Sequence, residues 1–235
     1  MIRFILTDIE GTTTSIHFVH KVLFPYARKN LRDFIELRAN EPEVEAALDE
    51  ATQTIFDETD IWADQDKCIA ILERWIDEDR KHPALKKIQG FIWRDGYETG
   101  AFTGHIYEDV PDMLREWKEN GIDLGVYSSG STEAQQLLFR HSDFGDLSQN
   151  FTAYFDTQAG HKRESDSYKF ITSQLPFLAD EILFLSDIEE ELDAAKTAGM
   201  QTIQLVREDT VASKRHETAP NFPAVNERIA ELNKA

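Results

Sequence analysis

The chain has 235 residues, of which 44 are Asp or Glu and 25 are Lys or Arg, and its formal net charge is −19. This excess of acid disfavours nucleic acid and membranes as partners, because both carry negative charge. The single cysteine, Cys68, cannot form an intramolecular disulfide, and no apolar run approaches the ~20 residues needed to cross a membrane. The start of the chain reaches Asp8 too soon for a signal sequence, so we expect a cytoplasmic protein.

Short apolar segments with β-rich composition predict about five strands, at residues 3–8, 122–128, 153–156, 181–186 and 201–206. Apolar residues between the later segments recur at helical spacing. Strands that alternate with single helices favour an α/β fold, with a Rossmann-like parallel sheet and helices on both faces. The tail after residue 206 is polar and loop-like until a last helix that carries Val225, Ile229 and Leu232.

Residues 17–100 interrupt this alternation. They show no strand pattern, and their apolar residues follow helical spacing, as in Val44, Leu48, Ala51 and Ile55. We therefore expect a helical subdomain at residues 17–100, inserted after the first strand of an α/β core formed by residues 1–16 and 101–235.

The first strand ends in Asp8-Ile9-Glu10. Residues two apart in an extended chain point the same way, so both carboxylates should face one site at the edge where open α/β sheets bind ligands. One carboxylate could act as a nucleophile or metal ligand while the other transfers protons. Alternatively, Asp8 and Glu10 simply begin a solvated loop.

Three later segments add further candidates. Ser128 and Ser129 follow a strand and precede a helix, where hydroxyl and N–H groups could bind phosphate; the alternative is ordinary helix capping by Ser131 or Thr132.

Asp187 ends another strand, so with Asp8 it could bring hard oxygen ligands to Mg²⁺. Lys162 could neutralise a phosphate or the carboxylates, or it could be an ordinary surface lysine.

The order Asp-x-Glu, Ser, Lys, Asp resembles the haloacid dehalogenase superfamily, in which a cap domain occupies the position of the helical insertion. Several segments resemble more narrowly the enolase-phosphatase (acireductone synthase) family of methionine salvage. These segments are Asp8–Thr14, Leu23–Tyr26, Gln89–Arg94, Tyr127–Ser131, Gly160–Lys162 and Leu183–Asp187. The superfamily usually has Asp two residues after the nucleophile, whereas Glu10 is typical of this family.

The resemblance implies a Mg²⁺-dependent phosphatase with enolase activity. It implies that Asp8 is the nucleophile and a metal ligand, and that Asp187 is a further metal carboxylate. Glu10 would bind the metal and, by superfamily analogy, could protonate the leaving oxygen. Ser128, Ser129 and Lys162 would bind the phosphate of the substrate.

The implied substrate is a small molecule, 2,3-diketo-5-methylthiopentyl-1-phosphate. The implied reaction enolises it and hydrolyses the phosphate through an aspartyl-phosphate, and the resemblance favours a monomer.

Other functions are possible for these residues. A related phosphatase could act on another small phosphate ester. A haloacid dehalogenase needs neither a metal nor an acid at the position of Glu10, so Glu10 and Asp187 argue against it. A phosphoacceptor signalling module typically lacks a large helical insertion after its first strand. A binding protein without activity would share the fold, but every expected catalytic position is intact.

Overall fold

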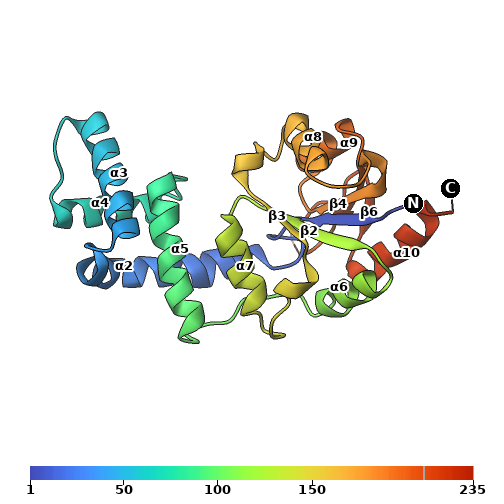
Figure 1. Ribbon diagram of the computed structural model, residues 1–235, viewed down its shortest axis with the longest axis horizontal. Helices are drawn as coiled ribbons and strands as arrows, with labels where there is room; N and C mark the ends of the chain where they lie inside the picture. The colour runs from blue at the N-terminus through green and yellow to red at the C-terminus, as the bar shows by residue number, and fades with distance from the viewer. Residues whose placement is uncertain (209, 235) are drawn as a thin grey trace. The chain divides into compact units, whose positions relative to one another are not determined.

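A parallel sheet of six strands forms the centre of one of the two units into which the chain divides (Figure 1). The computed structural model describes residues 1–208 and 210–234. The α/β unit comprises Met1–Ile16 and Thr103–Ala235, and the helical unit comprises His17–Phe102. Among the described residues, no helix has the length and apolar character to span a membrane.

The strands lie in the order β3-β2-β1-β4-β5-β6 and all pair in parallel. Their bounds are β1 Phe4–Thr7, β2 Asp123–Tyr127, β3 Ala153–Phe155, β4 Ile182–Ser186, β5 Gln201–Leu205 and β6 Glu217–Ala219. Every residue of β1 and β4 is buried, as expected when helices cover both faces of a parallel sheet. Because β1 pairs with both β2 and β4, the residues that follow these three strands meet at one edge.

Helices cover both faces of this sheet. They are α6 Val110–Glu119, α7 Thr132–Arg140, α8 Ser165–Ser173, α9 Glu189–Thr197 and α10 Phe222–Leu232. Helices α8 and α9 lie over one face, and α6 and α10 lie over the other (Figure 1). On the α8–α9 side, Phe4 and Leu6 of β1 pack with Tyr168, Phe184 and Leu192 in one buried cluster.

The helical unit has a hydrophobic core of its own. Its helices are α2 Phe24–Arg38, α3 Pro42–Thr59, α4 Gln65–Asp77 and α5 Pro83–Glu98, and they follow the short helices α1 Ile16–Phe18 and η1 Val19–Leu23. Residues at helical spacing, such as Leu31, Ile55, Leu72 and Ile88, are buried together. The Asp64 side chain begins α4 by accepting a hydrogen bond of 2.9 Å from the Lys67 N–H.

The α/β class, the five predicted strands and the helical insertion after the first strand are confirmed. The number of strands is corrected from five to six, because β6 lies in the tail that was predicted to be loop-like. Only Ala219 of its three residues is buried, so this edge strand is too short to show an alternating pattern. The last predicted helix is present as α10, which begins where Asn221 accepts a hydrogen bond from the Ala224 N–H at 2.9 Å.

Candidate active site

Asp8 lies directly beyond β1 and is only 3% exposed. Its N–H donates to the Leu185 carbonyl at 2.8 Å, which fixes it beside the end of β4. The chain then turns sharply, because the N–H groups of Thr13 and Thr14 both donate to the Ile9 carbonyl, at 2.9 and 3.0 Å. The position of Asp8 is therefore set by main-chain hydrogen bonds on both sides.

Gly11 allows this turn to approach Asp187. Its φ of +72° is unfavourable for other residues, and a Cβ atom there would lie 2.4 Å from Asp187 Oδ2. The turn that follows Asp8 therefore lies against the acid that follows β4, and both predicted acids belong to one site.

Lys162 is buried between two carboxylates. Its Nζ atom lies 2.6 Å from Asp8 Oδ1 and 2.7 Å from Glu191 Oε2. Burial lowers the pKa of the Lys162 ammonium group, but the charges of Asp8 and Glu191 outweigh burial and raise that pKa above its usual value. Lys162 is therefore a buried cation beside the candidate nucleophile, which excludes an ordinary surface lysine.

Glu191 also accepts a hydrogen bond from the Ser186 hydroxyl at 2.9 Å. Burial and the charge of Asp8 raise the pKa of Glu191 to about 7. The sequence offers little sign of this contact with Lys162, because Glu191 ends a run of three glutamates that is typical of a solvated helix start.

The carboxyl group of Glu10 points toward the end of β2. Its Oε2 atom accepts a hydrogen bond of 3.2 Å from the Ser128 hydroxyl. Burial and the charge of Asp8 raise the pKa of Glu10 above its usual range. Glu10 therefore keeps a proton more readily than an ordinary glutamate, and Lys162 pairs with Asp8 beside it.

The turn after β2 contains both a helix cap and a serine that faces the acid cluster. Ser131 caps α7 by accepting a hydrogen bond from the Ala134 N–H at 3.3 Å. Ser128 lies outside this cap, is buried, and accepts a hydrogen bond of 3.2 Å from the Gly130 N–H. Ser129 follows it and is exposed. Ser128 is therefore at the acid cluster, and the helix start requires only Ser131.

Asp187 carries an oxygen atom without a partner among the described residues. Its Oδ1 is inaccessible to solvent and makes no hydrogen bond. Burial and the charge of Asp8 raise the pKa of Asp187 to about 7. Asp8 and Glu191 contact Lys162 directly, and the charge of Lys162 also acts on the carboxyl groups of Glu10 and Asp187, so four carboxyl groups share one lysine.

A cation would relieve this charge imbalance. Within residues 1–208 and 210–234, however, no three His, Cys, Asp or Glu side chains form a group that could hold a metal ion. A metal here would need main-chain oxygen atoms or water besides the side chains of Asp8 and Asp187. The predicted set of Asp8, Glu10 and Asp187 therefore does not gather as three side-chain ligands.

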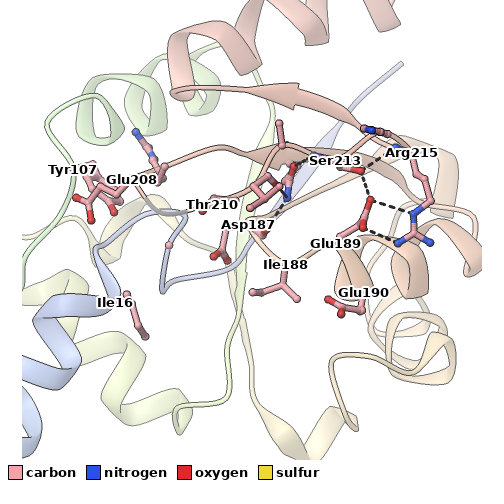
Figure 2. A pocket seen from close by; sticks show the side chains of 16 residues that line it. Ile16, Tyr107, Asp187, Ile188, Glu189, Glu190, Glu208, Thr210, Ser213 and Arg215 are labelled. Carbon is pink, nitrogen blue, oxygen red and sulfur yellow. Dashed lines mark hydrogen bonds and ion pairs between the residues drawn. The ribbon is translucent and has the colours of Figure 1, made fainter.

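A cavity of about 700 Å³ opens beside Asp187, and Figure 2 shows its lining. One wall is formed by residues 207–208 and 210–215, which follow β5, and Gln204 of β5 links this wall to the site. The Gln204 side chain donates to the Asp187 carbonyl at 2.8 Å and accepts from the Ser213 N–H at 2.6 Å. Arg215 pairs with Glu189 at 2.8 Å on the same wall. This role of Gln204 was not predicted from the sequence, although a polar residue within the apolar end of a strand is a usable signal.

Comparisons with known proteins place the chain in a family. The family model for haloacid dehalogenase-like hydrolases matches residues 2–199. The protein named enolase-phosphatase E1 from Erwinia tasmaniensis is 50% identical, covering 97% of this chain and 99% of its own. Its namesake from Picosynechococcus is 49% identical, covering 96% of this chain and 98% of its own.

Among solved structures, the UTR4 protein of Saccharomyces cerevisiae superposes with a TM-score of 0.77 at 31% identity, covering 94% of this chain and 99% of that protein. CbbY from Rhodobacter sphaeroides, crystallised with phosphate, has a TM-score of 0.57 at 18% identity and covers 94% of this chain and 95% of its own. The second likeness bears on the fold alone.

Proposed function

The chain belongs to the enolase-phosphatase E1 family of haloacid dehalogenase-like hydrolases, and we propose that it is the enolase-phosphatase of methionine salvage. It converts 2,3-diketo-5-methylthiopentyl-1-phosphate to the acireductone and phosphate. The observation that carries this proposal is the buried Asp8 carboxylate held 2.6 Å from the Lys162 ammonium group at the sheet edge. A phosphate dianion can approach a carboxylate only where positive charge offsets the repulsion.

Asp8 is the nucleophile of this proposal. Its carboxylate attacks phosphorus, the bond from phosphorus to the ester oxygen breaks, and an aspartyl-phosphate forms. Glu10, whose pKa is raised, carries the proton that the departing oxygen requires. Water then attacks phosphorus and loses a proton to Glu10, which releases inorganic phosphate and regenerates both carboxyl groups.

A divalent cation fits this site, and we propose Mg²⁺. The unpartnered Oδ1 of Asp187 and the excess of carboxylates over lysine support this assignment. Asp8 and Asp187 would hold the ion through carboxylate oxygens. Glu10 would contribute its main-chain oxygen, because its side chain bonds to Ser128. When bound, the ion supplies Lewis-acid stabilisation of the negative oxygens of the substrate.

The phosphate of the substrate would lie at the start of α7. Ser128 and Ser129 precede that helix, whose N-terminus favours anions. We assign substrate selectivity to the helical unit, His17–Phe102, and phosphoryl chemistry to the α/β unit. The enzyme would act as a cytoplasmic monomer on this small molecule.

The test is to incubate the purified protein with Mg²⁺ and the diketo phosphate, and to measure phosphate and the ultraviolet absorbance of the acireductone in parallel. Both products should appear. Asp8→Asn should lose phosphate release, whereas the control Asp123→Asn, at an exposed position, should keep it. Normal release by Asp8→Asn would overturn the mechanism. Phosphate release without the chromophore, from other esters only, would overturn the substrate.

A further inference from the structure

Three hydroxyl groups hold the segment that carries Lys162. The carbonyl oxygens of Gly160, His161 and Lys162 are consecutive along the chain. They accept hydrogen bonds from Tyr127 Oη at 3.0 Å, Ser167 Oγ at 2.8 Å and Tyr168 Oη at 2.7 Å, respectively. We call Tyr127, Ser167 and Tyr168 the hydroxyl clamp. Each clamp residue thus fixes one peptide group of the lysine segment.

The clamp residues are themselves rigidly placed. Tyr127 is the last residue of β2, and Tyr168 lies in α8; both are 0% exposed. Their rings pack edge to face at 5.5 Å between centroids, and the Tyr168 ring also contacts Phe184 of β4 at 5.1 Å. The clamp therefore holds the lysine segment in place relative to β2 and β4, the same strands that position other site residues.

Gly160 shows how closely this segment fits the clamp. Its φ is +121°, and a Cβ atom at this position would lie 2.2 Å from Ser167 Oγ. A side chain here would displace the hydroxyl that binds the next carbonyl. The contact thus requires glycine at residue 160 for two independent reasons, the backbone angle and the available space.

The clamp matters because Lys162 has a long, flexible side chain whose ammonium group must be placed accurately. Its four-carbon stem could adopt many rotamers, yet its Nζ lies within 2.7 Å of both Asp8 and Glu191. A shift of its main chain by about 1 Å would move the ammonium group away from the phosphate, and such displacements can cost about 10²-fold in rate. The main chain at residues 160–162 lies beyond the end of β3, so side-chain hydroxyls take over from strand pairing there.

We propose that Tyr127, Ser167 and Tyr168 are positioning residues that act on the reaction through Lys162. This inference rests on the role given to Lys162 in the proposed function. None of the three hydroxyls needs to touch the substrate, because each is occupied by a main-chain carbonyl of the lysine segment.

The first experiment removes single hydroxyls from the Mg²⁺-loaded enzyme. Tyr168→Phe and Ser167→Ala should each lower kcat for phosphate release about tenfold or more, with a smaller change in KM. The matched control is Tyr154→Phe, whose hydroxyl also donates to a main-chain carbonyl, that of Ser148 at 3.2 Å, but outside the lysine segment. It should retain its rate within about twofold. Equal rates for Tyr168→Phe and Tyr154→Phe would overturn the clamp.

A double-mutant cycle separates positioning from general destabilisation. In a Lys162→Met background, adding Tyr168→Phe should change the residual rate by less than about twofold, because the group that the clamp positions is already absent. All variants are assayed at a temperature where circular dichroism shows each folded, and Ser167→Ala replaces Tyr168→Phe if the latter fails to fold. A similar loss in both backgrounds would overturn the proposal.

The failure of this inference is distinguishable from failure of the proposed function. A wild-type enzyme that releases phosphate from esters without forming the acireductone overturns the proposed substrate, while the cycle on phosphate release still decides the clamp. Conversely, an additive cycle overturns the clamp and leaves the substrate and the nucleophile unaffected.

Discussion

Replacing Lys162 by Met should destabilise the protein as well as slow its reaction. The substitution keeps an unbranched side chain but removes the charge that lies 2.6 Å from Asp8 and 2.7 Å from Glu191. Two carboxylates then remain buried without a counter-charge. Removing one partner of a buried ion pair typically lowers the free energy of unfolding by 3–5 kcal/mol. We expect about 3 kcal/mol at pH 8, because the carboxylates can relieve part of the cost by binding protons.

The loss should depend on pH in a definite direction. In the variant, Glu191 would bind protons more tightly in the folded state than in the unfolded state, where carboxyl pKa values are about 4. The folded state then holds more protons above pH 4, so its stability falls as the pH rises. The pKa of Glu191 is about 7 even with Lys162 present, so the deficit should be smaller at pH 5 than at pH 8.

The assay is thermal unfolding followed by circular dichroism in EDTA, which keeps divalent cations from replacing the missing charge. A loss of about 3 kcal/mol corresponds to a fall in Tm of roughly 6–12 °C for a chain of this size. The matched control is Lys169→Met, which removes an exposed pair with Asp166 at 2.8 Å and should shift Tm by about 2 °C or less. Adding Glu191→Gln to Lys162→Met should restore part of the loss. Equal Tm values for Lys162→Met and Lys169→Met at pH 8 would refute this reasoning.

Three further predictions concern the metal and the helical unit. Chelation by EDTA should abolish phosphate release and Mg²⁺ should restore it, with Ca²⁺ a poor substitute because it prefers more ligands; full activity after exhaustive chelation would contradict the cation site. Because the pKa of Asp187 is about 7, the affinity for Mg²⁺ should fall below pH 7 by up to about tenfold per pH unit, as measured by calorimetry. A constant affinity from pH 5 to 8 would show that Asp187 does not bind the ion. Tyr26→Ala should raise KM for the diketo phosphate more than for a small phosphate ester, whereas equal losses would assign Tyr26 to packing against Phe102, whose ring lies at 4.9 Å.

The sequence predicted the parts of the site that follow buried strands. A strand covered on both faces is a nearly continuous apolar run, so its end is visible where a polar residue appears. Asp8, Ser128 and Asp187 all stand at such ends, after β1, β2 and β4. Parallel pairing then brings these ends to one edge, and that step needed only the order of elements along the chain.

The remaining contacts depend on packing that no local pattern records. Glu191 lies in a run of glutamates, and only the position of α9 shows that it meets Lys162 rather than solvent. Tyr168 lies on the apolar stripe of α8, where its ring alone accounts for burial, so the bond from its hydroxyl to the Lys162 carbonyl was not predictable. β6 was not predictable because its three residues bury too little apolar surface to leave a sequence pattern.

The charge imbalance at the sheet edge also implies an order of binding. With Asp8, Glu10, Asp187 and Glu191 around Lys162, a phosphate dianion that arrives before the cation meets net repulsion. A phosphate dianion that arrives afterwards meets a site to which the cation has already added two positive charges. Thermodynamic linkage makes this effect mutual, so substrate phosphate must tighten cation binding by the same factor by which the cation tightens phosphate binding. In the proposed enzyme, cation and substrate therefore act as each other's cooperative ligands, and at low magnesium the apparent affinity for substrate becomes a measure of cation supply.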